Sequence, residues 1–302
     1  MTGADKAEHV RLQVEDLARA EAFYRDVFGL AEVARENETI YFGCGLDGNY
    51  DLAIQQGEPG VEHIAVRIDA GPELEKYEER LASHGHEFKR TDGDEPGQER
   101  GLRVELPSQL PVELVAVSDN SYRHSEVVAV DGRSEIAPLD LNHYNFVSPD
   151  VREDAKFLRD VLDFNISEVV GDDWSGGAFL RRGDTHHDIA ALGLPGAPDE
   201  HASHHHTAFT VRSVDHMVQL IDRVRQAGVS LELGIGRHYA GDNLYAYFQA
   251  PDGHRLELTF QMAELDDETP TSVVDSPEDA ITAWQDDFIM PESFLQGSGL
   301  VR

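Results

Sequence analysis

The stretch EHVRLQVEDLARAEAFYRDVFGL, residues 8–30, has a counterpart in NHYNFVSPDVREDAKFLRDVLDF, residues 142–164. The two align through RDVF at 25–28 and RDVL at 159–162, an offset of 134 residues. Each opens on a short segment of alternating residues, which is typical of a strand, and continues with apolar residues at helical spacing. The chain is therefore expected to contain an internal duplication.

Each copy contains a second unit of the same kind. EHIAVRI at 62–68 resembles HHTAFTV at 205–211, and PSQLPVELVAV at 107–117 resembles PDGHRLELTFQ at 251–261. Further short strands, such as TIYFG and LYAYFQA, lie between these segments. The pattern predicts an α+β fold in which four βαβββ modules pair into two domains.

Domain boundaries follow from where the repeat begins and ends. We expect a first domain over 1–118 and a second over 139–262. The segment 118–138, which contains the turn-rich SDNSYRHS, is expected to link them. Residues 263–302 lie outside the repeat and are expected to form an acidic tail.

The charge is strongly acidic: 58 Asp and Glu against 25 Lys and Arg give a formal net charge of −33. Nucleic acid and anionic membrane surfaces would be repelled, so neither is expected as a partner. Lysines are few, namely Lys6, Lys76, Lys89 and Lys156. Few lysines with many carboxylates are typical of halophiles, whose molar salt screens the repulsion between like charges.

The cellular compartment is expected to be the cytoplasm. A single cysteine, Cys44, excludes an internal disulfide framework and fits a reducing compartment. No apolar run is long enough to span a membrane, and the polar start MTGADKAEHV lacks an apolar signal core. Hydrophobic residues make up 40% of the chain, which is enough for a folded core.

The repeat places the same residue types at the same points of both halves, and in the second half these residues are His143, His206 and Glu257. Each histidine is expected to start a strand, and Glu257 lies in the closing strand LELTF and points away from its leucines. Neighbouring strands of a curved sheet can bring such side chains to one point. Two histidines and a carboxylate suit a non-haem Fe(II) site with open positions, and Mn(II) accepts the same ligands.

The segment GRHYAGDNLYAYFQAPDGHRLEL, residues 236–258, resembles the signature of type I extradiol ring-cleavage dioxygenases. The signature residues are supplied by His238, Tyr247, Pro251, Gly253 and Glu257. Ala246 departs from the signature, because a larger apolar residue is usual there. Three further segments extend the resemblance: LNHYNFVSPDV (141–151), THHDIA (185–190) and HHHTAF (204–209). The whole chain is similar to the homoprotocatechuate and catechol 2,3-dioxygenase group of the vicinal oxygen chelate superfamily.

The resemblance implies that His143, His206 and Glu257 bind the metal, with no organic cofactor. It also implies four residues around the substrate: His187 as acid–base, His238 and Tyr247 as partners of the catechol oxygens, and Asn145 as a lining amide. The implied reaction of aromatic catabolism inserts both atoms of O₂ beside the diol of a catechol. Its product is of the 2-hydroxymuconic semialdehyde type.

Two other functions stay open at this point. Glyoxalases and epimerases of the superfamily use an extra glutamate or different ligands, and they do not need His187, His238 and Tyr247. Non-catalytic small-molecule-binding relatives commonly lack the triad. The identity of the catechol is also open, as is the choice between Fe(II) and Mn(II). Such modules often self-associate, so a homo-oligomer is expected.

Substrate preference is suggested by what the chain lacks. Leu233 stands where homoprotocatechuate enzymes place an arginine, and Phe179 corresponds to a tryptophan of that group. The segment ITAWQDDFIMPESF also has no match for the arginines of their tails. A pocket with fewer cations favours catechol, or an alkyl- or aryl-catechol, over homoprotocatechuate.

The first half carries a matching set, His9, His63 and Glu113. Its partners are missing, because Tyr50 stands at the position of His187, and Arg103 and Asp94 stand at those of Tyr247 and His238. The set is therefore interpreted as a vestige of duplication. Of the histidines before His206, both His204 and His205 are expected at a loop or rim.

Overall fold

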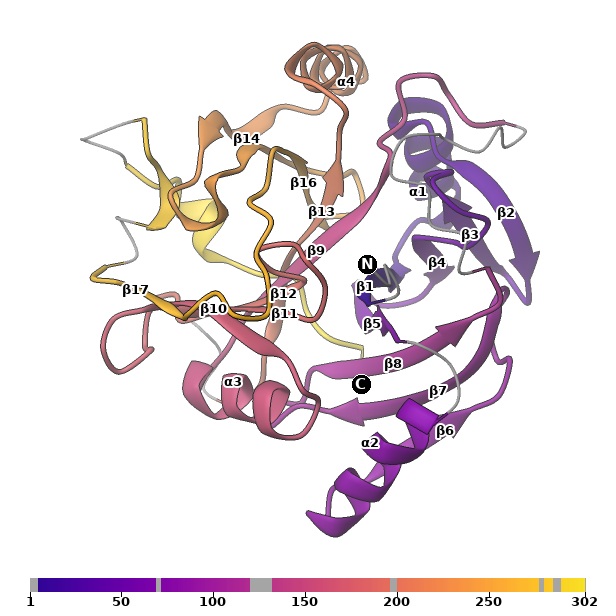
Figure 1. The fold of residues 1–302 in the computed structure, drawn as a ribbon. Helices are drawn as coiled ribbons and strands as arrows, with labels where there is room; N and C mark the ends of the chain where they lie inside the picture. Colours follow the sequence, from indigo (N-terminus) through magenta and orange to yellow (C-terminus); the bar gives the residue numbers. More distant parts are fainter. Residues whose placement is uncertain are drawn as a thin grey trace.

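The computed structural model describes residues 5–68, 72–119, 132–195, 200–276, 280–284 and 289–301. Two large mixed sheets lie side by side, each built from one half of the chain, with helices on the outside (Figure 1). Each half contains two modules in which one strand and one helix are followed by three strands. The predicted α+β fold of four βαβββ modules is confirmed.

The first sheet has the strand order β2-β3-β4-β1-β5-β8-β7-β6. Its strands are β1 (Lys6–Val14), β2 (Ala31–Glu36), β3 (Thr39–Gly43), β4 (Leu52–Gln56), β5 (Gly60–Arg67), β6 (Phe88–Thr91), β7 (Gln98–Glu105) and β8 (Pro111–Val117). The two modules join through β1 and β5, which pair antiparallel.

The second sheet has the order β14-β15-β16-β13-β9-β12-β11-β10-β17. Its strands are β9 (Asp140–Val147), β10 (Asn165–Val170), β11 (Gly177–Arg181), β12 (Ile189–Leu192), β13 (Ser203–Thr210), β14 (Leu231–Arg237), β15 (Leu244–Gln249), β16 (Arg255–Phe260) and β17 (Ser272–Val274). Here β9 and β13 form the antiparallel junction between modules.

The helices follow the first strand of each module. They are α1 (Leu17–Ala22), α2 (Pro72–Ser83), α3 (Val151–Asp160) and α4 (Val214–Gln226). Side chains of Asp16, Asp150 and Ser213 accept hydrogen bonds from backbone N–H groups three residues on, which caps α1, α3 and α4. Val214, the first residue of α4, is 44% exposed.

The first helix changes its geometry halfway. After α1, Phe23–Phe28 forms a π-helix (η1), which ends at Gly29 with a φ of +89°. A side chain at Gly29 would be strained in this conformation and would meet Ser134. The wider turn buries both Tyr24 and Phe28, and the Phe28 ring centroid lies 5.1 Å from that of Phe209 in the second sheet. This segment therefore joins the two halves in one core.

The described part of the tail after residue 262 packs back onto both sheets. Its strand β17 pairs in parallel with β10, and Leu300 bridges to Val61 in β5. Short 3-10 turns occur before and within it, at η2 (Ala240–Asp242) and η3 (Glu292–Leu295). Most of the expected linker, residues 120–131, lies outside the described residues. Within the described ranges, no helix combines the length and apolarity needed to cross a bilayer.

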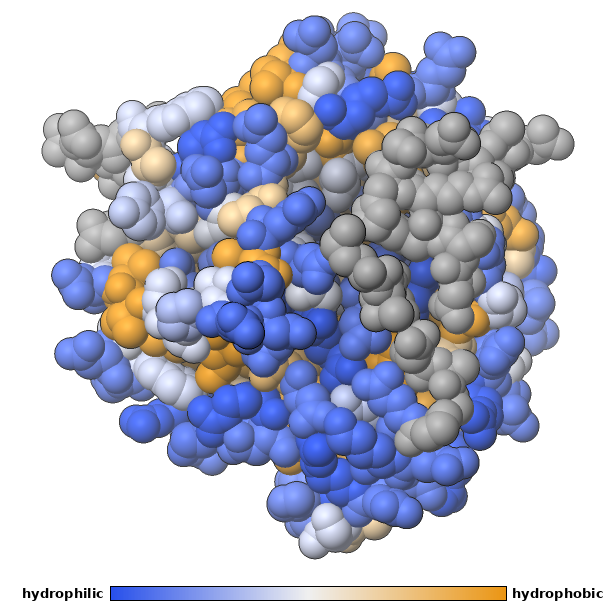
Figure 2. Space-filling view, in the orientation of Figure 1, coloured by the Kyte–Doolittle hydropathy of each residue, from blue (hydrophilic) through white to orange (hydrophobic). Residues whose placement is uncertain are grey.

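Salt should strongly affect stability. Hydrophilic side chains dominate the face shown in Figure 2, and the net charge of −33 must be carried largely on such surfaces. Because the screening length falls from about 10 Å at 0.1 M to about 3 Å at 1 M salt, repulsion is strongest in dilute buffer. We expect loss of fold or activity below roughly 0.5 M salt. Circular dichroism and activity that are equal in 0.1 M and 2 M KCl would contradict the halophile interpretation.

Candidate metal centre

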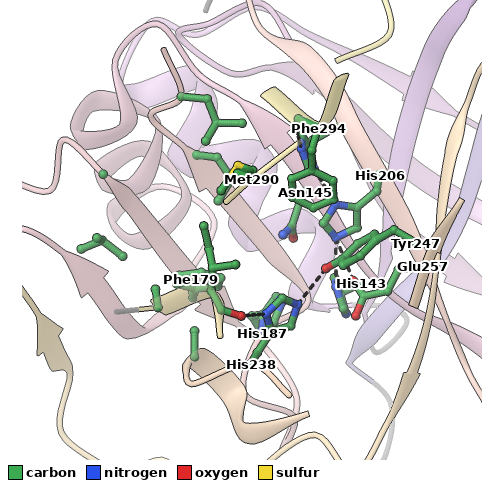
Figure 3. Close-up of a pocket in the computed structure, with 18 residues that line it drawn as sticks. His143, Asn145, Phe179, His187, His206, His238, Tyr247, Glu257, Met290 and Phe294 are labelled. Carbon is green, nitrogen blue, oxygen red and sulfur yellow. Dashed lines mark hydrogen bonds and ion pairs between the residues drawn. The ribbon is translucent and has the colours of Figure 1, made fainter. Parts of the chain in front are cut away.

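Three central strands of the second sheet bring His143, His206 and Glu257 together. Their side chains are buried and directed toward one point (Figure 3). The His143 Nε2 lies 3.3 Å from the His206 Nε2, and the Glu257 Oε2 lies 3.2 Å and 3.1 Å from these two nitrogens. The sequence predicts that these three side chains meet at one point, and the structure places them in one cluster.

The strand register explains how residues far apart in sequence meet. Strand β13 pairs antiparallel with β9, which contains His143, and parallel with β16, which contains Glu257. A register shift between His204 and His206 leaves His205 as an extra residue opposite β9, as in a β-bulge. The expectation that His204 and His205 lie at a loop or rim is wrong, because both are buried within β13. Likewise His143 and His206 lie within their strands, not at the first residue.

Hydrogen bonds fix which ring nitrogens face the cluster. The His143 Nδ1 lies 2.7 Å from the Asn142 Oδ1, which can only accept, so the proton is on Nδ1 and the lone pair of Nε2 points into the cluster. The His205 Nε2 donates to the Phe294 carbonyl at 2.7 Å. The His205 Nδ1 is then an acceptor for the His206 Nδ1, 2.6 Å away, and the His206 Nε2 is free to bind metal.

Glu257 is held as a carboxylate. Its Oε1 accepts from the Asn243 Nδ2 at 3.1 Å, and its Oε2 faces the two histidines. Burial acts to raise the pKa of Glu257, but His143 and His206 outweigh burial and hold that pKa well below its usual range. Burial lowers the pKa of His206 to about 4, so this ring is neutral near pH 7. Neutral imidazoles and an ionised carboxylate are the forms that bind metal.

The donor set fits a divalent ion. Ligands on one face of an octahedron with bonds of about 2.1 Å lie about 3.0 Å apart. The three separations here, 3.1 to 3.3 Å, are close to that value. Two neutral histidines and one carboxylate leave positions for other ligands, and the three donors border a pocket on that side.

The four residues expected around the substrate line the same pocket: Asn145, His187, His238 and Tyr247. The His187 ring centroid lies 4.2 Å from that of His143, but His187 is not part of the donor cluster. Burial lowers the pKa of His187 well below its usual value. The Asn145 Oδ1 is buried without a hydrogen-bond partner in the structure, and is thus available to a ligand.

His238 and Tyr247 form a hydrogen-bonded pair. The His238 Nδ1 donates to the Ile281 carbonyl at 2.6 Å, so its Nε2 accepts from the Tyr247 hydroxyl at 2.8 Å (Figure 3). The His238 ring also stacks on Tyr245, with centroids 4.0 Å apart. Burial raises the pKa of Tyr247 well above its usual value, which keeps the hydroxyl protonated.

Apart from His205 and Gly176, the rest of the pocket wall is apolar. It is lined by Val170, Phe179, Leu192, Leu194, Ala240, Ala280, Ile281, Met290 and Phe294. Among the described lining residues there is no lysine or arginine. Met290 and Phe294 come from the tail, which the sequence had placed outside the repeat. Sequence reasoning also missed Asn243 and His205 as supports of the ligands, since no repeat or spacing marks them.

In the first sheet, His9, His63 and Glu113 also lie together. Tyr50 takes the place of His187 as expected, because its ring centroid lies 4.4 Å from that of His9. Asp94 does not join the set, whereas its neighbour Glu95 does. A loop carboxylate with no counterpart in the second half could not be found from the repeat.

The fold and this site define a class: paired βαβββ modules with a two-histidine, one-carboxylate centre opening into a pocket. The profile described as the Glyoxalase/Bleomycin resistance protein/Dioxygenase superfamily matches residues 6–114 and 140–258. The chain belongs to this superfamily.

Similar proteins include extradiol dioxygenases. A manganese-dependent 2,3-dihydroxybiphenyl 1,2-dioxygenase from Geobacillus genomosp. 3 is 28% identical over 273 residues, covering 84% of each chain. Homoprotocatechuate 2,3-dioxygenase from Brevibacterium fuscum, in complex with 3,4-dihydroxyphenylacetate, superposes with a TM-score of 0.84 at 27% identity, covering 100% of this chain and 95% of that one. An Mn(II)-bound glyoxalase from Novosphingobium aromaticivorans gives 0.83 at 27% identity, covering 97% and 94%.

Proposed function

We propose that this protein is an extradiol dioxygenase that cleaves a catechol-type ring beside its diol. The observation that supports this most strongly is the placement of His187, His238 and Tyr247 on the pocket that the metal cluster borders. A binding protein would have no use for a buried, neutral histidine next to a metal ligand. The similarity to extradiol dioxygenases points the same way.

The proposed metal ligands are His143, His206 and Glu257, and the proposed ion is Fe(II). Manganese is the alternative, since the similar dihydroxybiphenyl dioxygenase is manganese-dependent and the donor set accepts both ions. The bound ion would hold both catechol oxygens and O₂ together, and it would allow electron density to pass from the ring to oxygen. We also infer that residues 139–262 form the catalytic domain, with 1–118 as the other domain.

Side chains of the protein are proposed to transfer the protons. A catechol must lose protons to chelate, and the neutral His187 is the base nearest to the cluster. His187 would hold that proton and could return it to oxygen during ring cleavage. The Tyr247 hydroxyl and the His238 ring lie where they can hydrogen-bond the substrate oxygens and stabilise negative charge there. One catechol and one O₂ give one ring-opened semialdehyde, with no other reactant.

The apolar wall suggests the substrate class. The described pocket residues offer no cation to a carboxylate, and Leu233, in the place of an arginine, lies beside Tyr245 and Tyr247. Burying a carboxylate without a cation is costly, whereas an alkyl or aryl group gains from apolar contact. We therefore propose catechol, or an alkyl- or aryl-catechol, as substrate.

A substrate panel tests the proposal. Protein loaded anaerobically with Fe(II) or Mn(II) is mixed with O₂ and catechol, an alkylcatechol, 2,3-dihydroxybiphenyl or homoprotocatechuate. We expect one O₂ consumed per yellow ring-fission product, and kcat/KM for an uncharged catechol about tenfold or more above that for homoprotocatechuate.

Two results would contradict these proposals. Absence of oxygen uptake with every catechol and both metals would contradict the dioxygenase function and favour a glyoxalase-type or binding role. A preference for homoprotocatechuate would leave the function intact and contradict the substrate class.

A further inference from the structure

The buried cluster in the first sheet has four donors, one more than the cluster described above. His9 lies on β1, His63 on β5 and Glu113 on β8, while Glu95 lies in the loop before β7. The His63 Nε2 lies 3.2 Å from the His9 Nε2, 3.3 Å from the Glu113 Oε2 and 3.6 Å from the Glu95 Oε2. The His9 Nε2 lies 3.5 Å from that Glu95 oxygen.

These four separations are close to one coordination geometry, and all six donor–donor separations are within 4.8 Å. Four ligands at about 2.1 Å from a central ion, arranged as a tetrahedron, lie about 3.4 Å from one another. All four side chains are at most 4% exposed. We propose that His9, His63, Glu95 and Glu113 form a second metal site, which holds Zn²⁺ or a similar divalent ion in closed, four-coordinate form.

The repeat shows why this site differs from the first. Arg103 pairs across the strands with Glu113, at the register position that Tyr247 holds opposite Glu257. With Tyr50 in the place of His187, the first half lacks the acid–base and substrate-binding groups. The loss of these groups argues against catalysis, and this loss was the basis for interpreting the set as vestigial. It does not argue against metal binding, because the ligands remain.

Glu95 closes the site. Its Oε2 takes the fourth position, and the Tyr50 hydroxyl and the Gln98 side chain both donate to that oxygen and orient it. None of the four donors lines the substrate pocket. A closed set of four protein ligands is typical of structural metal sites, whereas catalytic sites keep a position open. The ion would tie three strands and a loop together.

The surrounding charge favours a cation. Three carboxylates, those of Glu62, Glu95 and Glu113, contact the guanidinium groups of Arg11 and Arg103. The carboxylates are therefore in excess by one charge. Arg103 contacts Glu113 at 2.8 Å and the His63 Nε2 at 3.3 Å, and its Nη1 is directed toward Glu62. It therefore donates to two of the four proposed ligand atoms, and an ion bound at the centre of the set would take over the lone pair of the His63 Nε2 from Arg103.

The test uses the full chain with the other centre removed. His206→Ala/Glu257→Ala is stripped with a chelator, incubated with excess Zn²⁺, and passed through a desalting column before metal analysis. We expect about two equivalents of zinc in the wild type and about one in this variant. Zinc should also raise the Tm of the variant by about 4 °C. A folded variant, by circular dichroism, that retains no zinc would overturn the proposal.

A matched pair of substitutions locates the ion. In the same background, Glu95→Gln should lose the zinc, because an amide of the same shape is a much weaker ligand. Glu62→Gln should keep it, because Glu62 contacts the same arginines without being one of the four donors. Equal zinc retention by the two variants would overturn the assignment and indicate binding elsewhere. Because zinc retention is measured without turnover, a negative result at this site would not contradict the proposed dioxygenase function.

Discussion

Replacing His206 with alanine should remove the pocket-bound metal and nearly all ring-cleavage activity. The His206 Nε2 lies within 3.3 Å of the other two donors, and its side chain is buried, so no neighbour can take its place. A bound ion contributes several kcal/mol to such a reaction, so we expect kcat to fall by about 10³-fold or more. Iron content and oxygen uptake with catechol, measured on the same preparation, check the result. His143→Ala and Glu257→Ala should behave alike.

The matched control is His204→Gln, on the same strand. The His204 Nε2 pairs with the Thr207 hydroxyl at 3.0 Å, and an amide can keep that contact. This variant should retain iron and turnover. That result would show that replacing a β13 histidine does not by itself remove the metal or the activity. Full iron content and turnover in His206→Ala would instead overturn the ligand assignment.

His187→Phe should slow the reaction while leaving the iron in place. Its ring packs against His143 and Phe179, so phenylalanine fits the space, and the three metal ligands are untouched. A positioned acid–base group is worth about 10²–10⁴-fold in rate, and kcat should fall by that factor. Stopped-flow kinetics with catechol and an iron assay give the two readouts. Catechol binding should persist, and peroxide release is expected to rise because the oxygen fragment is no longer protonated promptly.

His238→Phe provides the contrast. It breaks the hydrogen bond to Tyr247, which frees the hydroxyl to reorient, so KM and kcat should both change. Loss of iron in His187→Phe would mean that His187 is a ligand. Wild-type kcat in that variant across pH 6–9 would mean that another residue moves the proton.

Much of the fold could be predicted because duplication leaves a periodic pattern. The alternation in EHIAVRI and the helical spacing in RDVF each depend on neighbouring residues, and four copies reinforce each other. The clustering of His143, His206 and Glu257 could be predicted for the same reason, since the first half repeats the set as His9, His63 and Glu113 on the corresponding strands.

Features without a counterpart in the repeat could not be predicted. The register shift around His205 depends on pairing between β13 and β9, which local sequence does not encode. Glu95 and Asn243 act from loops, where spacing carries no information. The placement of Phe294 against His205 depends on how the tail returns, which is a matter of tertiary packing.

The returning tail also sets an order of assembly. During synthesis, residues 289–301 emerge after every strand of both sheets. Until they dock, the His205 Nε2 has no Phe294 carbonyl to which it can donate a hydrogen bond. The His205 ring, which orients His206, can then adopt either tautomer. The same segment reaches Val61 in the first half through Leu300. The catalytic centre is thus completed only when this late segment docks, and the same segment links it to the first half of the chain.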